Sequence, residues 1–331
     1  MRLIAGFDAG QTHTTCRLAL AADPVAAAPG RVIGEGDGPG VCHLAAPEGP
    51  ERFGTALRES LVRARAHLID AGQTAGTAEL VAAAVGASGI EQGTAVQAQG
   101  QRLAAAALGL APERVLVTGD ERTALRGAFA GGAGIVVISG TGTIAVGRDG
   151  RGREHRCAGW GWLLDGAGSA MDIGRDGLAL SLQMADGRLP DAPLRRALWQ
   201  ELDLDPEDPG APQRLKALVV ADGFGPAGFA RLAPVIDRLA GAGDPRSLAV
   251  MKGNAAALAA MAAGVARSLD LLAPAVCPMG GALRHLEQLR TPFARCLAAA
   301  LPGSRLVGAA GDACQGALAL AAALAPGSQP A

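Results

Sequence analysis

The stretch LIAGFDAGQTHTTCRLAL, residues 3–20, decides the fold. Its first apolar residues predict a short buried strand that ends at Asp8, and residues 14–20 predict a second strand. The segment between them is rich in small and hydroxyl-bearing residues. A hairpin with a polar turn would explain this pattern. The alternative is a turn whose backbone N–H groups bind phosphate, with the Asp8 carboxylate beside it for a metal ion.

The same pattern returns in the second half of the chain. The segment GIVVISGTGTIAVG, residues 134–147, predicts two strands joined by a Gly/Thr turn. A third strand is predicted after each hairpin, at residues 31–35 and 153–158. The two copies share almost no sequence identity, so the repeat is one of pattern only. It indicates two related halves, each with a Gly/Thr hairpin.

Helical and strand periods alternate along the rest of the chain, which predicts an α/β fold. Proline at the helix start and glycine at the stop bound the first helix. The predicted helices cover residues 50–72, 92–109, 283–300 and 315–325 and most of residues 169–272. The further strands cover residues 79–89, 114–120 and 275–281.

Composition excludes several classes of protein. The chain has 331 residues, 49% apolar content and a net charge of −1, which favours two globular domains without a basic surface for nucleic acid. Aromatic residues are 3%, too few for a base-stacking platform. Asp8 falls where a signal peptide needs its apolar region, and the Ala-rich stretches near Ala255 and Ala317 are interrupted by charged residues or glycine. We therefore expect a cytoplasmic protein with no membrane partner.

Other catalytic motifs do not occur in the sequence. The six cysteines have no C-x-x-C spacing, the five histidines form no metal-binding pattern, and neither lysine lies in a G-x-x-x-x-G-K-[ST] loop. The cysteines are therefore expected to be buried or idle thiols. Phosphate chemistry remains the better interpretation of the two turns, since glycine and threonine let backbone N–H groups approach a phosphate. Two such turns could hold a triphosphate between two domains whose closure excludes water.

Asp120 is the second acid at a strand end. It lies where the strand at 114–120 is expected to turn into a helix, so it could be the helix N-cap. A carboxylate in this place could instead accept a hydroxyl proton during phosphoryl transfer.

Several segments together resemble the N-acetylglucosamine kinase and BadF-type ATPase family, a branch of the superfamily that contains hexokinase, actin and the heat-shock chaperone ATPases. The similarity spans nearly the whole chain in the family's order. The phosphate motifs are matched by DAGQTHT (8–14) and GIVVISGTGTIAVG (134–147), the catalytic-aspartate segment by VTGDERTALRGAF (117–129), a strand end by GASG (86–89), the tryptophan–glycine signature by AGWGWLLDGAGSAMDIG (158–174), the adenosine-side glycines by MGGAL (279–283), and the closing helix by GALALA (316–321).

The resemblance implies an α/β fold of two ribonuclease-H-like domains, of the actin/hexokinase ATPase type, with an interdomain cleft for ATP and Mg²⁺. The N-terminal domain would cover residues 1–118 and be joined by the C-terminal helix 315–331. The C-terminal domain would cover residues 119–314.

The resemblance also implies roles for individual residues. Asp8 would lie beside the magnesium ion, and Asp120 would be the general base toward a sugar hydroxyl. The phosphates would be held by Gly10, Gln11, Thr12, Gly140, Thr141 and Gly142. The adenosine would be flanked by Gly280 and Gly281.

The sugar side departs from the family pattern in two places. Where the family has a sugar-binding asparagine after its third strand, this chain offers Cys42 or His43. Where the family has Gly-Asp-Glu-Gly-Ser, it has Asp165-Gly166-Ala167-Gly168-Ser169, so the acid is moved by one position or lost. With Trp160, which could instead pack in the core, Cys42, His43, Asp165 and Ser169 make up the predicted sugar side. A changed polar partner can alter which substrate is accepted.

The sequence therefore predicts an ATP-dependent kinase that phosphorylates a hydroxyl of an amino sugar or N-acetylated sugar. One alternative is a nucleotide- or sugar-binding sensor without turnover, which the altered segment 165–169 motivates. Another is an activator ATPase of a reductase or dehydratase, which needs cysteines for an iron–sulfur cluster; Cys157 has no suitably spaced partner. The expected partner is a small-molecule sugar, with no nucleic acid, and the resemblance adds a homodimer.

Overall fold

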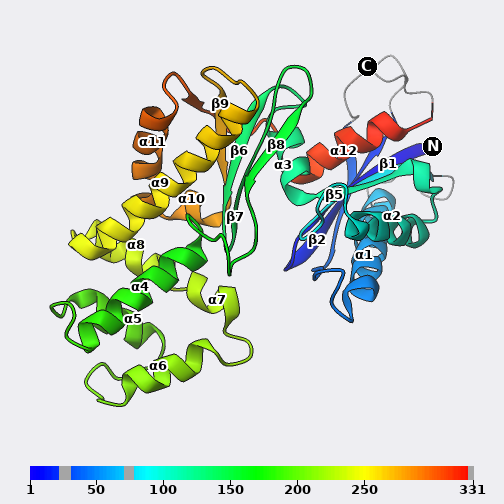
Figure 1. Ribbon diagram of the computed structural model, residues 1–331. Coiled ribbons are helices and arrows are strands. Elements are labelled where there is room, and N and C mark those ends of the chain that lie inside the picture. The colour runs from blue at the N-terminus through cyan, green and yellow to red at the C-terminus, as the bar shows by residue number, and fades with distance from the viewer. Residues whose placement is uncertain (22–30, 71–77, 327–331) are drawn as a thin grey trace. The chain divides into compact units, whose positions relative to one another are not determined.

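The computed structural model describes residues 1–21, 31–70 and 78–326. The chain divides into two compact units, shown in Figure 1. Unit 1 comprises Met1–Gly132 and Ala309–Ala331, and unit 2 comprises Ala133–Gly308.

Unit 1 is built on a five-stranded mixed sheet in the order β3-β2-β1-β4-β5. Strand β1 pairs antiparallel with β2 and parallel with β4, so the hairpin and the α/β alternation predicted from the sequence meet in one sheet. The third strand is longer than predicted and runs on to the edge of the turn region. The strands are β1 (Arg2–Ala9), β2 (His13–Leu20), β3 (Val32–Pro39), β4 (Glu79–Ala87) and β5 (Val115–Gly119).

Helices cover both faces of this sheet because the central strands are buried on both sides. Successive residues of a strand face opposite sides, so Phe7 packs toward α1 (Gly49–Asp70) and α2 (Ala95–Leu108), while Ile4 packs toward α12 (Ala313–Leu324). Figure 1 shows α12 in red, running along β1.

The helix α3 (Asp120–Ala128) belongs to unit 1, because it packs against α12 with backbone close to backbone. A Cβ on Gly316 would overlap the carbonyl oxygen of Thr123, and a Cβ on Gly127 would overlap that of Asp312. The boundaries of the units therefore lie at 132/133 and 308/309 and differ from the predicted 118/119 and 314/315. As a result Asp120 lies in the first unit instead of the second.

Unit 2 repeats the same sheet topology. Its order β10-β9-β6-β7-β8 corresponds strand for strand to that of unit 1, with the antiparallel hairpin again followed by a third antiparallel strand. The pattern repeat in the sequence is thus a repeat of topology. The strands are β6 (Gly134–Ser139), β7 (Thr143–Arg148), β8 (Glu154–Ala158), β9 (Ala275–Met279) and β10 (Arg305–Leu306), of which β10 was not predicted.

The helices of unit 2 enclose a second hydrophobic core around Trp199, Phe293 and Ile135. Most of them form the predicted helical stretch between β8 and β9. They are α4 (Ala170–Ala185), α5 (Pro193–Glu201), α6 (Ala211–Val219), α7 (Gly225–Ala230), α8 (Ala233–Gly241), α9 (Pro245–Ser268), α10 (Gly281–His285) and α11 (Glu287–Ala300).

The helix α9 corrects one expectation, since it runs without a break through the stretch expected to be interrupted. By length and composition alone it could cross a membrane, and half of the apolar window is buried inside the protein. Its buried residues include Met251, Leu258 and Ala262, which belong to the core of unit 2. We therefore assign α9 as a core helix.

Candidate functional site

The first Gly/Thr turn is a short connection at the end of β1 and is locked by backbone hydrogen bonds. The N–H of Gly10 donates to the carbonyl oxygen of His13 at 3.0 Å, and the carbonyl of Gly10 accepts from the N–H of Val41 at 2.9 Å. A Cβ on Gly40 would overlap the backbone of Gln11, so the chain after β3 lies directly against the turn. Gln11 and Thr12 are exposed at its tip.

Asp8, the penultimate residue of β1, lies in an environment that disfavours its charged form. Burial, and to a lesser extent the charges of Asp120 and Asp312, raise the pKa of this carboxyl to about 6 against the opposing influence of His13 and Arg17. The structure thus brings Asp8 and Asp120 close enough to interact electrostatically. An acid with a raised pKa at a strand end, beside other acids, is typical of a functional site.

Asp120 is the first residue of α3, and the N-cap of this helix is Gly119. The alternative interpretation of Asp120 as the N-cap is therefore wrong. Burial raises the pKa of Asp120, and hydrogen bonds from Glu121 oppose that rise. A half-buried carboxylate with a raised pKa is suited to accept a proton.

An ion network lies beside Asp8 in unit 1. The guanidinium of Arg17 donates to Glu35 on β3 at 2.5 Å and to both carboxylate oxygens of Asp312 at 2.7 and 2.6 Å. Asp312 is also the N-cap of α12, accepting from the N–H of Gln315 at 2.9 Å. Arg17 thus ties the hairpin to the C-terminal helix.

The predicted sugar residues of unit 1 follow β3. His43 is exposed, and its Nδ1 accepts a hydrogen bond from the N–H of Ala45 at 3.2 Å. Its ring lies against Gly89, just after β4. Cys42 is half-buried, with Sγ 3.9 Å from a carboxylate oxygen of Glu48. His43 therefore reaches the loop after β4, at the same end of the sheet as Asp8.

The second Gly/Thr turn joins β6 and β7, and the N–H of Gly140 donates to the carbonyl of Gly142 at 2.9 Å. Thr141 is exposed between them. A Cβ on Gly140 or on Gly142 would meet no protein atom within 4 Å, and neither residue has a positive φ. Because the fold does not require glycine at these positions, the open space suits the close approach of a ligand such as a phosphate.

The glycine pair after β9 divides into two roles. Gly280 has a φ of 89°, and a Cβ there would overlap the backbone of Ser139, so only glycine fits. Gly281 has open space where its Cβ would be. The fold therefore requires glycine at position 280, whereas Gly281 is free to border a ligand.

The tryptophan–glycine segment lies next to the second turn. The Trp160 ring is 61% exposed with the Arg156 guanidinium 4.4 Å from its centroid, so Trp160 does not pack in the core of unit 2. Asp165 is half-buried. Ser169 is fully buried as the N-cap of α4, with Oγ accepting from the N–H of Asp172 at 3.0 Å. Its hydroxyl thus caps the N-terminus of α4.

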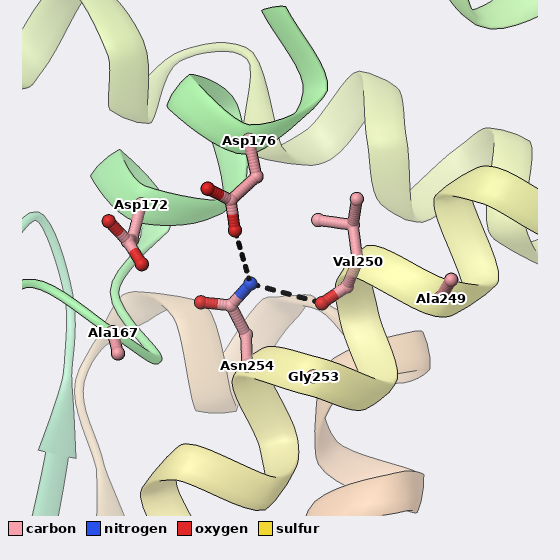
Figure 2. A pocket seen from close by; sticks show the side chains of 7 residues that line it. All are labelled: Ala167, Asp172, Asp176, Ala249, Val250, Gly253 and Asn254. Carbon is pink, nitrogen blue, oxygen red and sulfur yellow. Dashed lines mark hydrogen bonds between the residues drawn. The ribbon is translucent and has the colours of Figure 1, made fainter. Parts of the chain in front are cut away.

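A cavity of about 200 Å³ lies between α4 and α9 (Figure 2). Acidic and amide side chains border it, and Asn254 points into it from α9. The carboxylate of Asp172 is 7% exposed, its pKa is raised by burial, and it contacts Arg175. The lining residues are Ala167, Asp172, Asp176, Ala249, Val250, Gly253 and Asn254.

Three residues of the site region were not expected from the sequence: Ser139, Asn254 and Asp312. Asp312 precedes Gln315 by three residues, which is a recognisable capping pattern. Asn254 is the one asparagine in an alanine-rich helix, which is also a visible signal. The hydroxyl of Ser139 gave no local signal, because its partner is the distant carbonyl of Gly168 at 2.6 Å.

Among the described residues, no three His, Cys, Asp or Glu side chains are grouped to hold a metal ion by themselves. A magnesium ion is commonly held by one or two carboxylates, waters and substrate phosphates. The oxygen donors around Asp8 fit that kind of binding.

Comparison with known proteins gives the family. The model of the BadF/BadG/BcrA/BcrD ATPase family matches residues 6–316. A 75-residue segment is 40% identical to the N-acetylmuramic acid/N-acetylglucosamine kinase of Clostridium acetobutylicum, covering 23% of this chain and 24% of that protein. It is 39% identical to the N-acetyl-D-glucosamine kinase of Dictyostelium discoideum, with the same coverage. The matched segment thus spans about a quarter of these curated relatives.

Solved structures resemble the whole chain. A candidate N-acetylglucosamine kinase from Chromobacterium violaceum is 26% identical with a TM-score of 0.69, covering 97% of this chain and 99% of that one. The ROK hexokinase of Thermus thermophilus is 18% identical with a TM-score of 0.57, covering 98% of each chain. The two mixed sheets therefore form the predicted fold of the actin/hexokinase type.

Proposed function

The chain belongs to the BadF/BadG/BcrA/BcrD ATPase family, and we propose that it is an ATP-dependent kinase that phosphorylates a hydroxyl of an amino sugar or N-acetylated sugar. One observation carries the proposal. Asp120, with a raised pKa, lies within electrostatic reach of Asp8 in unit 1. Phosphoryl transfer to a hydroxyl needs a proton acceptor and an acid that holds a metal ion. The kinases among the relatives support this assignment.

The proposed reaction gives Asp120 the role of general base. Its carboxylate accepts the proton of the sugar hydroxyl as the oxygen bonds to the γ-phosphorus of ATP. The bond from that phosphorus to the β–γ bridging oxygen breaks, and ADP leaves. A raised pKa makes Asp120 a better proton acceptor than an ordinary aspartate.

Asp8 would hold Mg²⁺, which when bound neutralises the charge of the phosphates. The two Gly/Thr turns, Gly10–Thr12 and Gly140–Gly142, would supply backbone N–H groups to the phosphates. The open space at Gly140 and Gly142 supports this role for the second turn. Gly281, which also borders open space, would lie on the adenosine side.

Contacts to the sugar are proposed separately for the residues that follow β3 in unit 1 and for the tryptophan–glycine segment in unit 2. His43 and Cys42 take the place of the family's asparagine, and Trp160 offers an exposed ring face to a sugar. Asp165 would accept hydrogen bonds from sugar hydroxyls. The buried Ser169 would position the segment instead of contacting the sugar. We propose that the enzyme acts in the cytoplasm, without a nucleic-acid or membrane partner, as a homodimer.

An ADP-release assay with Mg²⁺-ATP tests the proposal directly. The panel would contain amino sugars, N-acetylated sugars, neutral hexoses and anhydro-sugars. A sugar-dependent rate that D120N removes is the expected result. Sugar binding by calorimetry without ADP release would instead support the sensor, for which the altered segment 165–169 is the specific observation. ATP hydrolysis that no sugar stimulates would contradict the kinase.

A further inference from the structure

Asn254 is a buried polar side chain in α9, a helix whose other buried residues are mostly apolar. It is 4% exposed and lies in the middle of α9. A buried side-chain amide destabilises a fold unless its donors and acceptor are paired, so an asparagine here needs partners.

Those partners come from three different elements, as Figure 2 shows in part. The Oδ1 of Asn254 accepts a hydrogen bond from the N–H of Gly168 at 2.8 Å. Its Nδ2 donates to the carbonyl of Val250, one turn earlier in α9, at 3.0 Å, and to the carboxylate of Asp176 on α4 at 3.3 Å. One amide thus connects α9, α4 and the segment before α4.

Gly168 is held from its other side as well. Its carbonyl accepts a hydrogen bond from the hydroxyl of Ser139, at the end of β6, at 2.6 Å. Its φ is 88°, a conformation that few other residues adopt, and a Cβ there would press on Leu258. Gly168 is therefore fixed by a side chain of α9 on one side and one of β6 on the other.

The segment fixed in this way leads directly into the site. Ser169, the next residue, is the N-cap of α4. The N–H of Ala170 then donates to the carbonyl of Gly140 in the second Gly/Thr turn at 2.8 Å. Asp165 and Trp160 precede Gly168 on the same segment. Gly168 thus lies between the proposed sugar residues and the residue that contacts the turn.

We propose that Asn254 is a positioning residue whose amide sets the Gly168 backbone, and through it the sugar side of segment 160–169. This inference rests on the proposed function for its catalytic consequence. Its structural part, the dependence of the segment on the Asn254 amide, stands without it.

Hydrogen exchange followed by mass spectrometry tests the structural part on the full chain. N254A removes the acceptor of the Gly168 N–H, so exchange in peptides covering 164–170 should accelerate at least tenfold relative to peptides of β6. S247A is the matched control, because Ser247 is fully buried on the same helix and its hydroxyl donates only to Asp244, the cap of α9. Unchanged exchange in N254A, or an equal acceleration in S247A, would overturn the proposal.

A second variant keeps the test informative if N254A does not fold. N254D retains an acceptor for the Gly168 N–H and loses both donated hydrogen bonds. Its segment 164–170 should stay protected while peptides of α4 around Asp176 exchange faster. The reverse pattern, with the segment released and α4 unchanged, would contradict the assigned contacts.

The catalytic consequence is measured by steady-state kinetics on the same variants. N254A should raise KM for the sugar about tenfold and change KM for ATP less than threefold, whereas S247A changes neither. A purely structural role would lower the active fraction and leave both KM values unchanged. If the unaltered protein phosphorylates no sugar, the proposed function fails while the exchange result still decides the structural part.

Discussion

The two units carry the same sheet and equivalent hairpins, but the polar side chain near the end of the first strand differs between them. In unit 1 it is Asp8, an acid with a raised pKa close to Asp120. In unit 2 it is Ser139, a buried hydroxyl that holds the carbonyl of Gly168. The same sheet topology therefore carries different chemical groups in the two units. Unit 1 has charged side chains near the ends of its strands. Unit 2 instead has backbone groups held by hydrogen bonds and glycines that border open space.

The largest expected effect comes from removing the proposed base of unit 1. D120N should lower kcat about a hundredfold or more, because the amide cannot accept the hydroxyl proton. Its stability at neutral pH should not fall, since burial already disfavours the charged carboxylate. The measurements are ADP release at saturating substrates and thermal unfolding.

The matched control for D120N is E51Q, which changes an exposed acid in the first turn of α1. Its kcat should remain within about twofold of the parent protein, because surface substitutions away from special features have small effects. Normal turnover of D120N would contradict the assignment of Asp120 as the general base. The proposed chemical contrast between the units would then be lost.

A second comparison concerns glycines that are packed in unit 1 and open in unit 2. G316A should destabilise the protein by about 1–3 kcal/mol, because its Cβ would overlap the carbonyl of Thr123. G142A should leave the melting temperature unchanged, since its Cβ meets no protein atom, and weaken ATP binding about tenfold. Thermal unfolding and calorimetric titration with an ATP analogue measure the two effects. If G142A were the less stable variant, the assignment of its open side to a ligand would be wrong.

The sequence predicted local features of this comparison well. Every strand except β10, the turns between the strands and the position of Asp8 near a strand end could be predicted because each depends on neighbouring residues, as in the apolar run before Asp8. The fold class followed from the alternation of helix and strand and from the resemblance. Asp120 was placed at the right strand end and in the wrong unit, because the α3–α12 contact joins residues that are far apart in the sequence.

Long-range pairing explains what the sequence did not reveal. Asn254 and Gly168 are separated by 86 positions, and no local period links them. The strand β10 has two exposed residues, Arg305 and Leu306, and lacks the apolar alternation that marks a strand. The expected interruption of α9 did not occur, because Gly264 is tolerated within a well-packed helix and Arg267 lies in its last turn.

The raised pKa of Asp8 predicts that the Mg²⁺ requirement of the enzyme depends on pH. A carboxyl with a pKa of about 6 is mostly ionised at pH 7 and mostly protonated at pH 5.5, so the Mg²⁺ concentration for half-maximal rate should rise about fourfold over this range. In D8N the remaining pH dependence of this Mg²⁺ concentration should come only from the protonation of ATP itself. Subtracting the D8N profile from that of the parent protein isolates the contribution of Asp8. Equal pH profiles in both proteins would contradict the assignment.

The stability of D8N supplies an independent check. Because the folded state raises the pKa of Asp8 from 3.8 to about 6, folding stability falls as the pH rises through this window and the carboxyl ionises. D8N should therefore be more stable than the parent protein at pH 7.5 and lose that advantage below about pH 4. Urea unfolding at the two pH values measures the difference. A less stable D8N at pH 7.5 would mean that Asp8 supports the fold instead of a ligand.

The smallest expected effect concerns the Arg17–Asp312 pair beside Asp8. Both side chains are partly exposed, so their coupling in a double-mutant cycle of R17M and D312N should not exceed about 1 kcal/mol. Asparagine remains a good N-cap, so D312N removes the charge and keeps the start of α12. The Arg17 charge lowers the pKa of Asp8 and the Asp312 charge raises it. R17M should therefore move the Mg²⁺ profile to higher pH and D312N to lower pH. Shifts in the same direction would show that the pair acts on Asp8 through the packing of α12, and the charge contrast between the units would then rest on Asp8 and Asp120 alone.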